Sequence, residues 1–262
     1  MKSFDSGPPA KFLKHFTALP DYTPIKDLFW FDWGPVIYRG RLDGTAKVIC
    51  VASDPGPTER IGGRTLVGNA GQRVQGFLKK IGLNQSYVCV NGFVYALFPG
   101  KLSKGIKALS LSEQVAWRNK LFDLLKTPSV KAIIAFGAVA QKVVELWPGT
   151  AGLTVVNTFH PSYHSPKAGS EKKMLEDWNR VVTELRAVVP PDVGVTVDLP
   201  LYGSTFAESD YAPVPRFDLP FGLPEWFGDD RWFRSRRKMN SVSRPSPDDR
   251  HTLTWKAPDF SL

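Results

Sequence analysis

The segment KVICVASDPGPTE (Lys47–Glu59) holds the pattern that decides the fold. The stretch KVICVA at its start is short and rich in β-branched residues, and Asp-Pro-Gly-Pro follows it, which is typical of a buried strand that ends in a turn. An amphipathic helix is predicted next, over Asn69–Leu83, because apolar residues recur at spacings of three and four from Val74 to Ile81. Asn69 is its expected N-cap.

The same alternation of strand and helix continues along the chain. Further strands are predicted at Ser86–Asn91, Ala132–Gly137 and Leu153–Phe159, and further helices at Leu111–Lys126, Ala138–Trp147 and Ser170–Val189. This order predicts an α/β fold of three layers, α/β/α, with a central, mostly parallel four-stranded sheet. Ligands of such sheets bind beyond the carboxyl ends of the strands, so the functional residues are expected there.

The length and composition indicate one main domain, which we expect over residues 1–190. A chain of 262 residues that is 42% hydrophobic can bury one sizeable core. From Pro190 onward the sequence changes to short pieces punctuated by Pro and Gly, so residues 191–262 are expected to form a C-terminal extension. The aromatic segment Phe29–Gly40 could be a strand or an apolar lid.

The charge and cysteine content narrow the classes of function. The formal net charge is +9, from 34 basic and 25 acidic residues, which favours a polyanionic partner such as nucleic acid or an anionic membrane surface. Cys50 and Cys89 both lie in apolar runs, and two cysteines are too few for a disulfide framework, a zinc site or an iron–sulfur cluster. We therefore expect no metal and no cofactor.

The sequence also indicates where the protein resides. Two buried, reduced thiols suit a cytoplasmic protein. The first twelve residues lack an apolar stretch of signal-peptide length, and no run approaches the roughly 18 apolar residues of a membrane-spanning helix. We expect a soluble, cytoplasmic monomer without a membrane partner.

Three of the predicted strands end in polar segments. They are ASDPGPTE (Ala52–Glu59) with the following Gly62–Leu83, VNGFVYALFP (Val90–Pro99) and FHPSYHSP (Phe159–Pro166). Together, and in this order, they resemble the signature segments of the uracil-DNA glycosylase superfamily. The resemblance mixes features of the aspartate-using branch and of the iron–sulfur bacterial and archaeal branch, without the cluster cysteines of the latter. It implies a DNA-repair enzyme that flips uracil out of DNA and hydrolyses its N-glycosidic bond to leave an abasic site.

The resemblance assigns catalysis to Asp54 and His160. Asp54 matches the carboxylate that positions water and stabilises the positive sugar, and His160 matches the histidine that donates a hydrogen bond to uracil O2 as the base leaves. Each residue also has a plain structural interpretation. An Asp before Pro-Gly usually caps a turn, and a His before Pro is often a satisfied loop residue. The order of the three segments favours the catalytic interpretation.

Two polar residues at strand ends are expected to bind the base. Asn91 corresponds to the asparagine that reads the O4 and N3 edge of uracil, because an amide donates and accepts together. An Asn at a strand end is also a common turn residue. Ser53 stands where the iron–sulfur branch carries a glutamate, and we expect it to lie against the substrate.

The residues that would select and stack uracil depart from the family pattern. Gly56 stands where one branch has a tyrosine that blocks the methyl group of thymine, so the rejection of thymine is left open. Leu66 replaces the phenylalanine that stacks on uracil in the iron–sulfur branch. Stacking is therefore expected from elsewhere, with Phe98 and Phe159 as candidates.

The remaining expected contacts are with the DNA backbone and groove. The resemblance places Ser162 on a phosphate, and Tyr163 and His164 on a loop that enters the minor groove to fill the gap left by the flipped nucleotide. Leucine is usual at the place of His164, and an ordinary exposed loop is the alternative. Arg64 is also expected to bind DNA. The basic, aromatic stretch Arg231–Lys238 suits phosphate contact and stacking, but could equally be a solvated surface.

The leading hypothesis is thus a cofactor-free enzyme that acts on uracil-containing DNA. The main alternative is a protein on the same fold that binds damaged or abasic DNA with little turnover. A third hypothesis takes the Asp-Pro-Gly-Pro turn as a phosphate cradle of a nucleotide-binding enzyme. It ranks low because neither GxGxxG nor GxxxxGK[ST] occurs at the end of the first strand.

Overall fold

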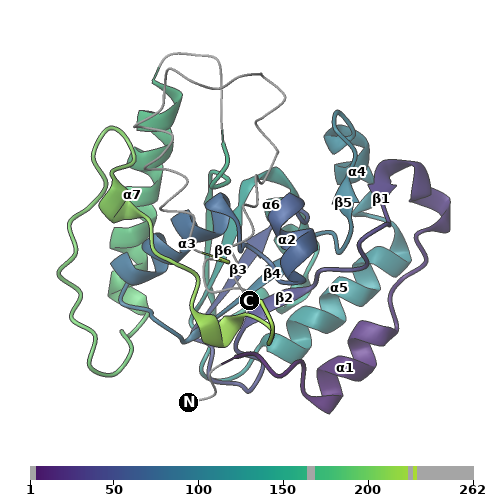
Figure 1. The fold of residues 1–262 in the computed structure, drawn as a ribbon, viewed down its shortest axis with the longest axis horizontal. Coiled ribbons are helices and arrows are strands. Elements are labelled where there is room, and N and C mark those ends of the chain that lie inside the picture. Colours follow the sequence, from purple (N-terminus) through teal and green to yellow (C-terminus); the bar gives the residue numbers. More distant parts are fainter. Residues whose placement is uncertain (1–3, 164–168, 224–226, 229–262) are drawn as a thin grey trace, which may run out of the picture. The chain divides into compact units, whose positions relative to one another are not determined.

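A computed structural model describes residues 4–163, 169–223 and 227–228 (Figure 1). Within them, the main sheet has five strands in the order β2-β4-β3-β6-β7. The strands are β2 (Tyr38–Gly40), β3 (Val48–Ala52), β4 (Tyr87–Asn91), β6 (Ala132–Phe136) and β7 (Thr154–Thr158). All neighbours pair in parallel except β2 and β4, which are antiparallel. The sheet is therefore mostly parallel, as predicted.

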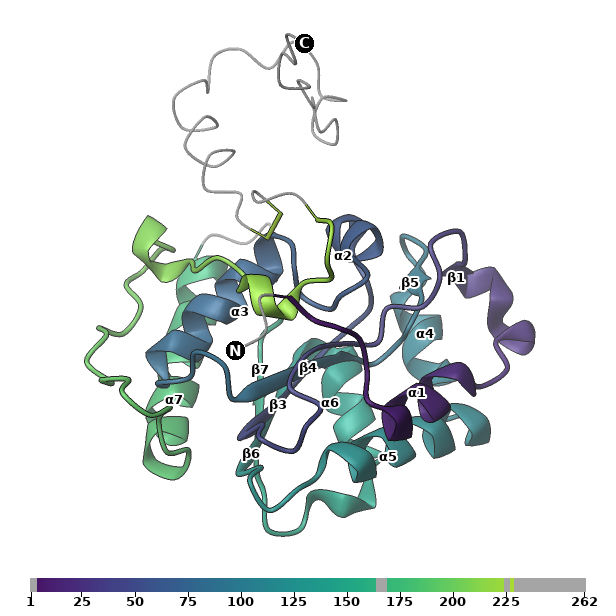
Figure 2. The same ribbon diagram turned by 60° about the horizontal axis from the view of Figure 1, so that its bottom comes forward.

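Helices cover both faces of the sheet, which confirms the three-layer α/β/α architecture. On one face lie α1 (Ala10–Thr17), α4 (Leu102–Ala108), α5 (Ser112–Leu125) and α6 (Gly137–Glu145), and on the other lie α3 (Asn69–Lys80) and α7 (Ser170–Val188) (Figures 1 and 2). Successive side chains of a strand point to opposite faces. Ile49 and Val51 accordingly join the first core, and Val48 and Cys50 the second.

The fifth strand comes from the aromatic segment Phe29–Gly40, whose structure the sequence left open. Its first part, β1 (Phe29–Trp30), pairs with β5 (Ala96–Leu97) in a separate two-stranded sheet, and its last part is the edge strand β2. Because Arg39 is fully buried in the middle of β2, the segment lacks the apolar pattern of a buried strand. The expected count of four strands was thus one too low.

Two smaller expectations had different outcomes. Cys50 and Cys89 are buried and free, as predicted, and they lie opposite each other on β3 and β4. The helix α3 begins at Asn69, but its N-cap is Gly68, and no side chain caps it. The short helix α2 (Pro57–Gly62) precedes it.

The compact unit continues beyond the boundary expected at residue 190. Contacts within the chain group Met1–Asp229 as one unit and Asp230–Leu262 as another, and Arg231–Lys238 lies outside the described residues. We call residues 191–223 the C-terminal strap. In Figures 1 and 2 it runs, in green, past α7 and α3. At its far end, the Asp5 N–H donates to the Leu219 carbonyl at 2.8 Å.

Three buried carboxylates attach the C-terminal strap to the domain. Asp192 accepts the backbone N–H groups of residues 84–86 and pairs with Lys47. Asp210 pairs with Lys80 at 2.8 Å, and Asp218 pairs with the buried Arg39 at 3.0 Å. Because the cationic partners lie on β2, α3 and the segment before β3, the strap joins elements far apart in sequence.

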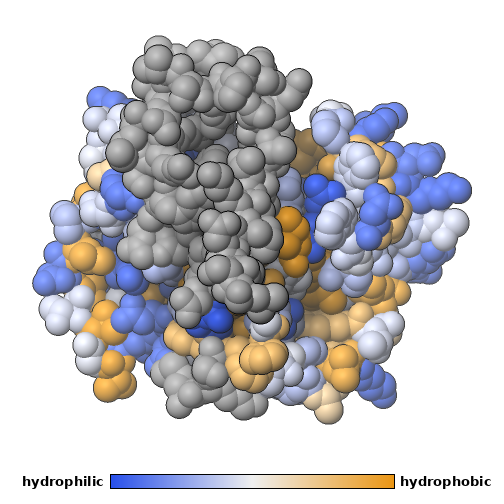
Figure 3. All heavy atoms as spheres, in the orientation of Figure 1, coloured by the Kyte–Doolittle hydropathy of each residue, from blue (hydrophilic) through white to orange (hydrophobic). Residues whose placement is uncertain are grey.

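Hydrophobic and hydrophilic residues are interspersed on the visible face of the domain (Figure 3). In the described part of the chain, no helix is both long enough and apolar enough to cross a membrane.

Candidate functional site

The ends of β3 and β4 bring three of the expected site residues to one edge of the sheet. Ala52, the last residue of β3, pairs in parallel register with Asn91, the last residue of β4. Ser53 and Asp54 follow directly. The Phe93 N–H donates to the Ser53 carbonyl at 2.9 Å, which keeps the chain beyond β4 beside the chain beyond β3. Ser53, Asp54 and Asn91 therefore share this edge.

Asp54 is held by contacts on both carboxylate oxygens. The Leu97 N–H donates to Oδ2 at 2.9 Å, and the Ser53 hydroxyl donates to Oδ1 at 2.7 Å. Burial raises the pKa of Asp54 above its ordinary value and the nearby Glu59 adds to this, whereas the two hydrogen bonds and Arg60 oppose it. Oδ2 accepts its hydrogen bond from a residue 43 positions away, so Asp54 does more than cap its own turn.

His160 reaches the same edge from β7. It packs against Gly137, the first residue after β6, and a Cβ added to Gly137 would lie 3.0 Å from the His160 Cβ. Gly137 also has a φ of +81°, a conformation that favours glycine. Since β6 pairs with both β3 and β7, this contact places His160 at the carboxyl end of β6, next to the strand that leads into Asp54.

A hydrogen bond defines the tautomer of the imidazole. The Ser162 N–H donates to His160 Nδ1 at 3.2 Å. Nδ1 is then an acceptor, and the ring proton of neutral His160 lies on Nε2. Burial lowers the pKa of His160 to about 4, so the ring is neutral at physiological pH. His160 can therefore donate one hydrogen bond through Nε2.

Asn91 is buried, and its amide is oriented by the backbone. Its Nδ2 donates to the Val36 carbonyl at 3.2 Å, just before β2. An amide bound in this way still has a second N–H and an acceptor oxygen to offer. The orientation is thus fixed while both kinds of contact are left for a ligand.

The two candidates for stacking each lie beside another aromatic ring. Phe98 follows Leu97, whose N–H binds Asp54, and its ring centroid is 4.5 Å from that of Trp30. Phe159 immediately precedes His160, and its ring centroid is 4.6 Å from that of Tyr163. Both pairs border the edge that carries Asp54 and His160.

Gly56 and Leu66 lie in close-packed surroundings. A Cβ on Gly56 would lie 2.6 Å from a Glu59 carboxylate oxygen, so Glu59 occupies the space beside it. Leu66 has a φ of +56° and is 4% exposed, and it packs in the core beneath α3 and α7. The structure thus gives Leu66 a core contact.

The expected DNA contacts are divided between two regions. Ser162 and Tyr163 are exposed on the loop after His160, and His164 lies outside the described residues. Arg64 instead donates to Asp5 at 2.7 Å, and its guanidinium lies over the Tyr38 ring. Its charge is therefore already paired within the chain.

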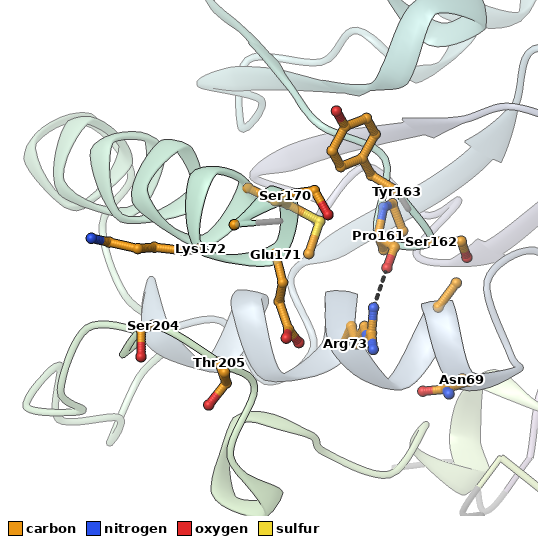
Figure 4. Close-up of a pocket in the computed structure, with 13 residues that line it drawn as sticks. Asn69, Arg73, Pro161, Ser162, Tyr163, Ser170, Glu171, Lys172, Ser204 and Thr205 are labelled. Carbon is orange, nitrogen blue, oxygen red and sulfur yellow. Dashed lines mark hydrogen bonds between the residues drawn. The ribbon is translucent and has the colours of Figure 1, made fainter. Parts of the chain in front are cut away.

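A pocket of about 650 Å³ adjoins the loop after His160 (Figure 4). Its lining includes Asn69, Arg73, Ser162, Tyr163, Ser170 and Lys172. Asp54 and Asn91 are not part of this lining. The pocket is thus separate from the site at the ends of β3 and β4, although both adjoin the loop after His160.

The family comparison fits this geometry. The model of the uracil DNA glycosylase superfamily matches residues 40–183, more than half of the 262 residues. The chain belongs to this superfamily. The matched part of the chain contains Asp54, Asn91 and His160, and membership supports DNA glycosylase activity in general. A comparison with curated proteins finds no significant match.

Two further residues that shape the site could not be selected from the sequence. Glu59 is a buried carboxylate near Asp54, and it accepts the backbone N–H groups of Val67 and Gly68 at 2.9 Å each. Arg73 donates to the Pro161 carbonyl at 2.8 Å. Glu59 lies within the quoted ASDPGPTE segment, but only the folded backbone shows its role. In the sequence, Arg73 occupies an ordinary polar position of the predicted amphipathic helix.

Among the described residues, no group of three or more His, Cys, Asp or Glu side chains could hold a metal ion.

Proposed function

We propose that the protein removes uracil from DNA by hydrolysing the N-glycosidic bond and leaves an abasic site. The observation that carries the proposal is the convergence of Asp54, Asn91 and His160 at one edge of the sheet, within the part that matches the superfamily. These side chains supply a carboxylate, an amide and a neutral imidazole. Such a set can stabilise both ends of a bond that separates charge.

In the proposed reaction, the bond between C1′ of the sugar and N1 of uracil breaks, and its electron pair leaves with the base. The sugar becomes positively charged and the base negatively charged. Asp54 stabilises the sugar cation and orients a water molecule, which adds to C1′ and gives up a proton to the carboxylate. The Nε2–H of His160 donates to uracil O2, where negative charge grows.

Base selection and DNA contact are assigned to the surrounding residues. Asn91 reads the O4 and N3 edge of uracil with its free N–H and its oxygen. Phe98 and Phe159 border the site and could each supply a stacking surface. Ser162 and Tyr163 are exposed on the loop beside His160, so they can contact the phosphate backbone and the gap left by the flipped nucleotide.

A single gel experiment tests the proposal against the main alternative, a binding protein with little turnover. Oligonucleotides that carry one uracil, one hypoxanthine or one abasic site are incubated with the protein and then treated with alkali. A parallel mobility shift measures binding. We expect cleavage of the uracil strand after alkali. A shift of abasic DNA without cleavage of the uracil strand would instead establish the binding protein.

The rate of excision should depend on pH in one direction only. The reaction needs neutral His160 and ionised Asp54, and both forms are lost as the pH falls. The pKa of His160 is about 4, and that of Asp54 lies above its ordinary 3.8. We therefore expect the single-turnover rate to decline as the pH falls, with the loss due to His160 centred near pH 4 and not near 6.5, where an ordinary histidine titrates. A decline centred near 6.5 that persists in Asp54→Asn would show that His160 is not held neutral by its surroundings.

Asn91→Asp should change which base is accepted. The carboxylate cannot donate to uracil in the way that the amide does, whereas the N4 amino group of cytosine is a donor that it can bind. We expect loss of uracil excision or a gain of cytosine excision, measured on otherwise identical oligonucleotides. Asn157→Asp, an exposed position on β7, is the matched control. Unchanged preference for uracil would remove Asn91 from the base-binding site.

A further inference from the structure

Arg73 links the helix α3 to the loop that carries His160. Its Nη1 donates to the Pro161 carbonyl at 2.8 Å, and Figure 4 shows the guanidinium reaching from α3 to this loop. Pro161 stands between His160 and Ser162, and the Ser162 N–H is the donor to His160 Nδ1. Arg73 therefore holds the His160–Ser162 backbone, which orients the imidazole, at its middle residue, Pro161.

The C-terminal strap holds Arg73 in turn. The Tyr211 hydroxyl accepts hydrogen bonds from Nε at 3.2 Å and from Nη2 at 3.1 Å. The guanidinium carbon lies 4.2 Å from the centre of the Phe206 ring. The strap is anchored beside these contacts, because the Ala212 N–H donates to the Gln72 carbonyl on α3 at 3.1 Å.

These contacts use the shape of arginine and not only its charge. A guanidinium is planar, with donors that point in several fixed directions, so it can bind a hydroxyl along one side and a carbonyl along another while it lies against an aromatic ring. A lysine would keep the positive charge but could not form all three contacts together. We call this arrangement, in which Arg73 binds the His160–Ser162 loop and is itself held by Tyr211 and Phe206, the clamp.

We propose that Arg73, held by Tyr211 and Phe206 of the C-terminal strap, is a positioning residue that fixes the His160–Ser162 loop for catalysis. The proposal rests on the function proposed above for His160. Tyr211 and Phe206 lie beyond residue 183, where the superfamily match ends. A segment outside the matched region thus acts on a loop inside it.

Four variants test the clamp: Arg73→Met, Arg73→Lys, Tyr211→Phe and the control Lys79→Met. Lys79 lies on the same helix and carries the same charge, and its side chain is exposed. Tyr211→Phe removes only the hydroxyl and keeps the ring, so it tests the clamp even if Arg73→Met folds poorly. Single-turnover excision is measured over a range of protein concentrations, which separates the rate at saturation from the concentration needed for half that rate.

We expect Arg73→Met to lower the saturating rate about 10- to 100-fold, because small displacements of a catalytic group cost rates of this order. The half-saturating concentration should change little. Arg73→Lys should not restore the rate, Tyr211→Phe should lower it by a smaller factor, and Lys79→Met should match the wild type. If Arg73→Lys restores the rate, or if only the half-saturating concentration rises, Arg73 is a DNA contact and the proposal is wrong.

A second readout does not depend on activity. The ring nitrogens of His160 are observed by NMR in the free protein, with signals assigned from His160→Ala. We expect the wild type to show the Nε2–H tautomer, Arg73→Met to show a changed tautomer population, and Lys79→Met to resemble the wild type. Unchanged His160 signals in Arg73→Met would overturn the clamp. If the wild type excises no uracil, this readout still tests the clamp, while the proposed function alone has failed.

Discussion

Replacing Asp54 with Asn should slow uracil excision about 100- to 1,000-fold, while affinity for abasic DNA stays largely intact. An asparagine oxygen can still accept the Leu97 N–H, so the local structure should survive. What is lost is the negative charge beside the developing sugar cation. The measurement is single-turnover release of uracil, with circular dichroism to confirm folding.

A matched control separates this role from that of an ordinary turn residue. Asp43 accepts hydrogen bonds from the N–H and the hydroxyl of Thr45, so it caps its own turn at the opposite end of β3. Asp43→Asn should excise uracil at the wild-type rate. A folded Asp54→Asn variant that also excises at the wild-type rate would return Asp54 to the same structural role.

His160 serves the other end of the same charge separation, so its loss should be related to that of Asp54. His160→Ala should be slowed by a similar factor because the departing base loses its hydrogen-bond donor. Both side chains stabilise one transition state. The double variant should therefore lose less than the product of the two single losses.

The largest expected effect on stability is that of Asp218→Asn. Asp218 is 1% exposed, and its carboxylate contacts Arg39, Arg41 and the Tyr87 hydroxyl. The change leaves the fully buried guanidinium of Arg39 without a charged partner, and loss of one member of a buried ion pair typically costs about 3–5 kcal/mol of unfolding free energy. Unfolding by urea, followed by circular dichroism, measures the difference.

An exposed ion pair is the control for this prediction. Lys172 and Glu176 pair on the surface of α7, with side chains 63% and 64% exposed. Glu176→Gln should unfold at nearly the same urea concentration as the wild type, because exposed pairs contribute little. If Asp218→Asn behaves in the same way, the buried pair does not secure the C-terminal strap.

The sequence predicted those helices and strands that are determined by residues close together in the chain. The strands β3, β4, β6 and β7 are short apolar runs followed by turn residues, and periodic apolar residues mark the helices between them. The strand β2 was left open because the charge of Arg39 is neutralised by Asp218, which lies 179 residues away. The strap extends the compact unit past residue 190 for the same reason, since its buried carboxylates pair with distant cations.

The residues of the site divide in the same way: some can be selected from the nearby sequence, and others only from contacts between distant parts of the chain. Asp54, Asn91 and His160 could be selected because each stands at or just after the end of a predicted strand in a recognisable segment. Arg73 could not, because its contacts with Pro161 and Tyr211 exist only once α3, the loop and the strap are assembled. In the sequence, Leu66 stands at the position of a stacking residue. In the structure its φ is positive and its side chain lies in the core.

The contact between His160 and Gly137 has a consequence for how the site is kept in order. The imidazole rests on main chain at the end of a central strand, and a backbone surface has no rotamers of its own to be fixed. Central strands exchange their amide hydrogens mostly through global unfolding, whereas loops open locally at little cost. On this side, the surface that supports the imidazole of His160 therefore persists until the sheet itself unfolds, which is much rarer than the local opening of a loop.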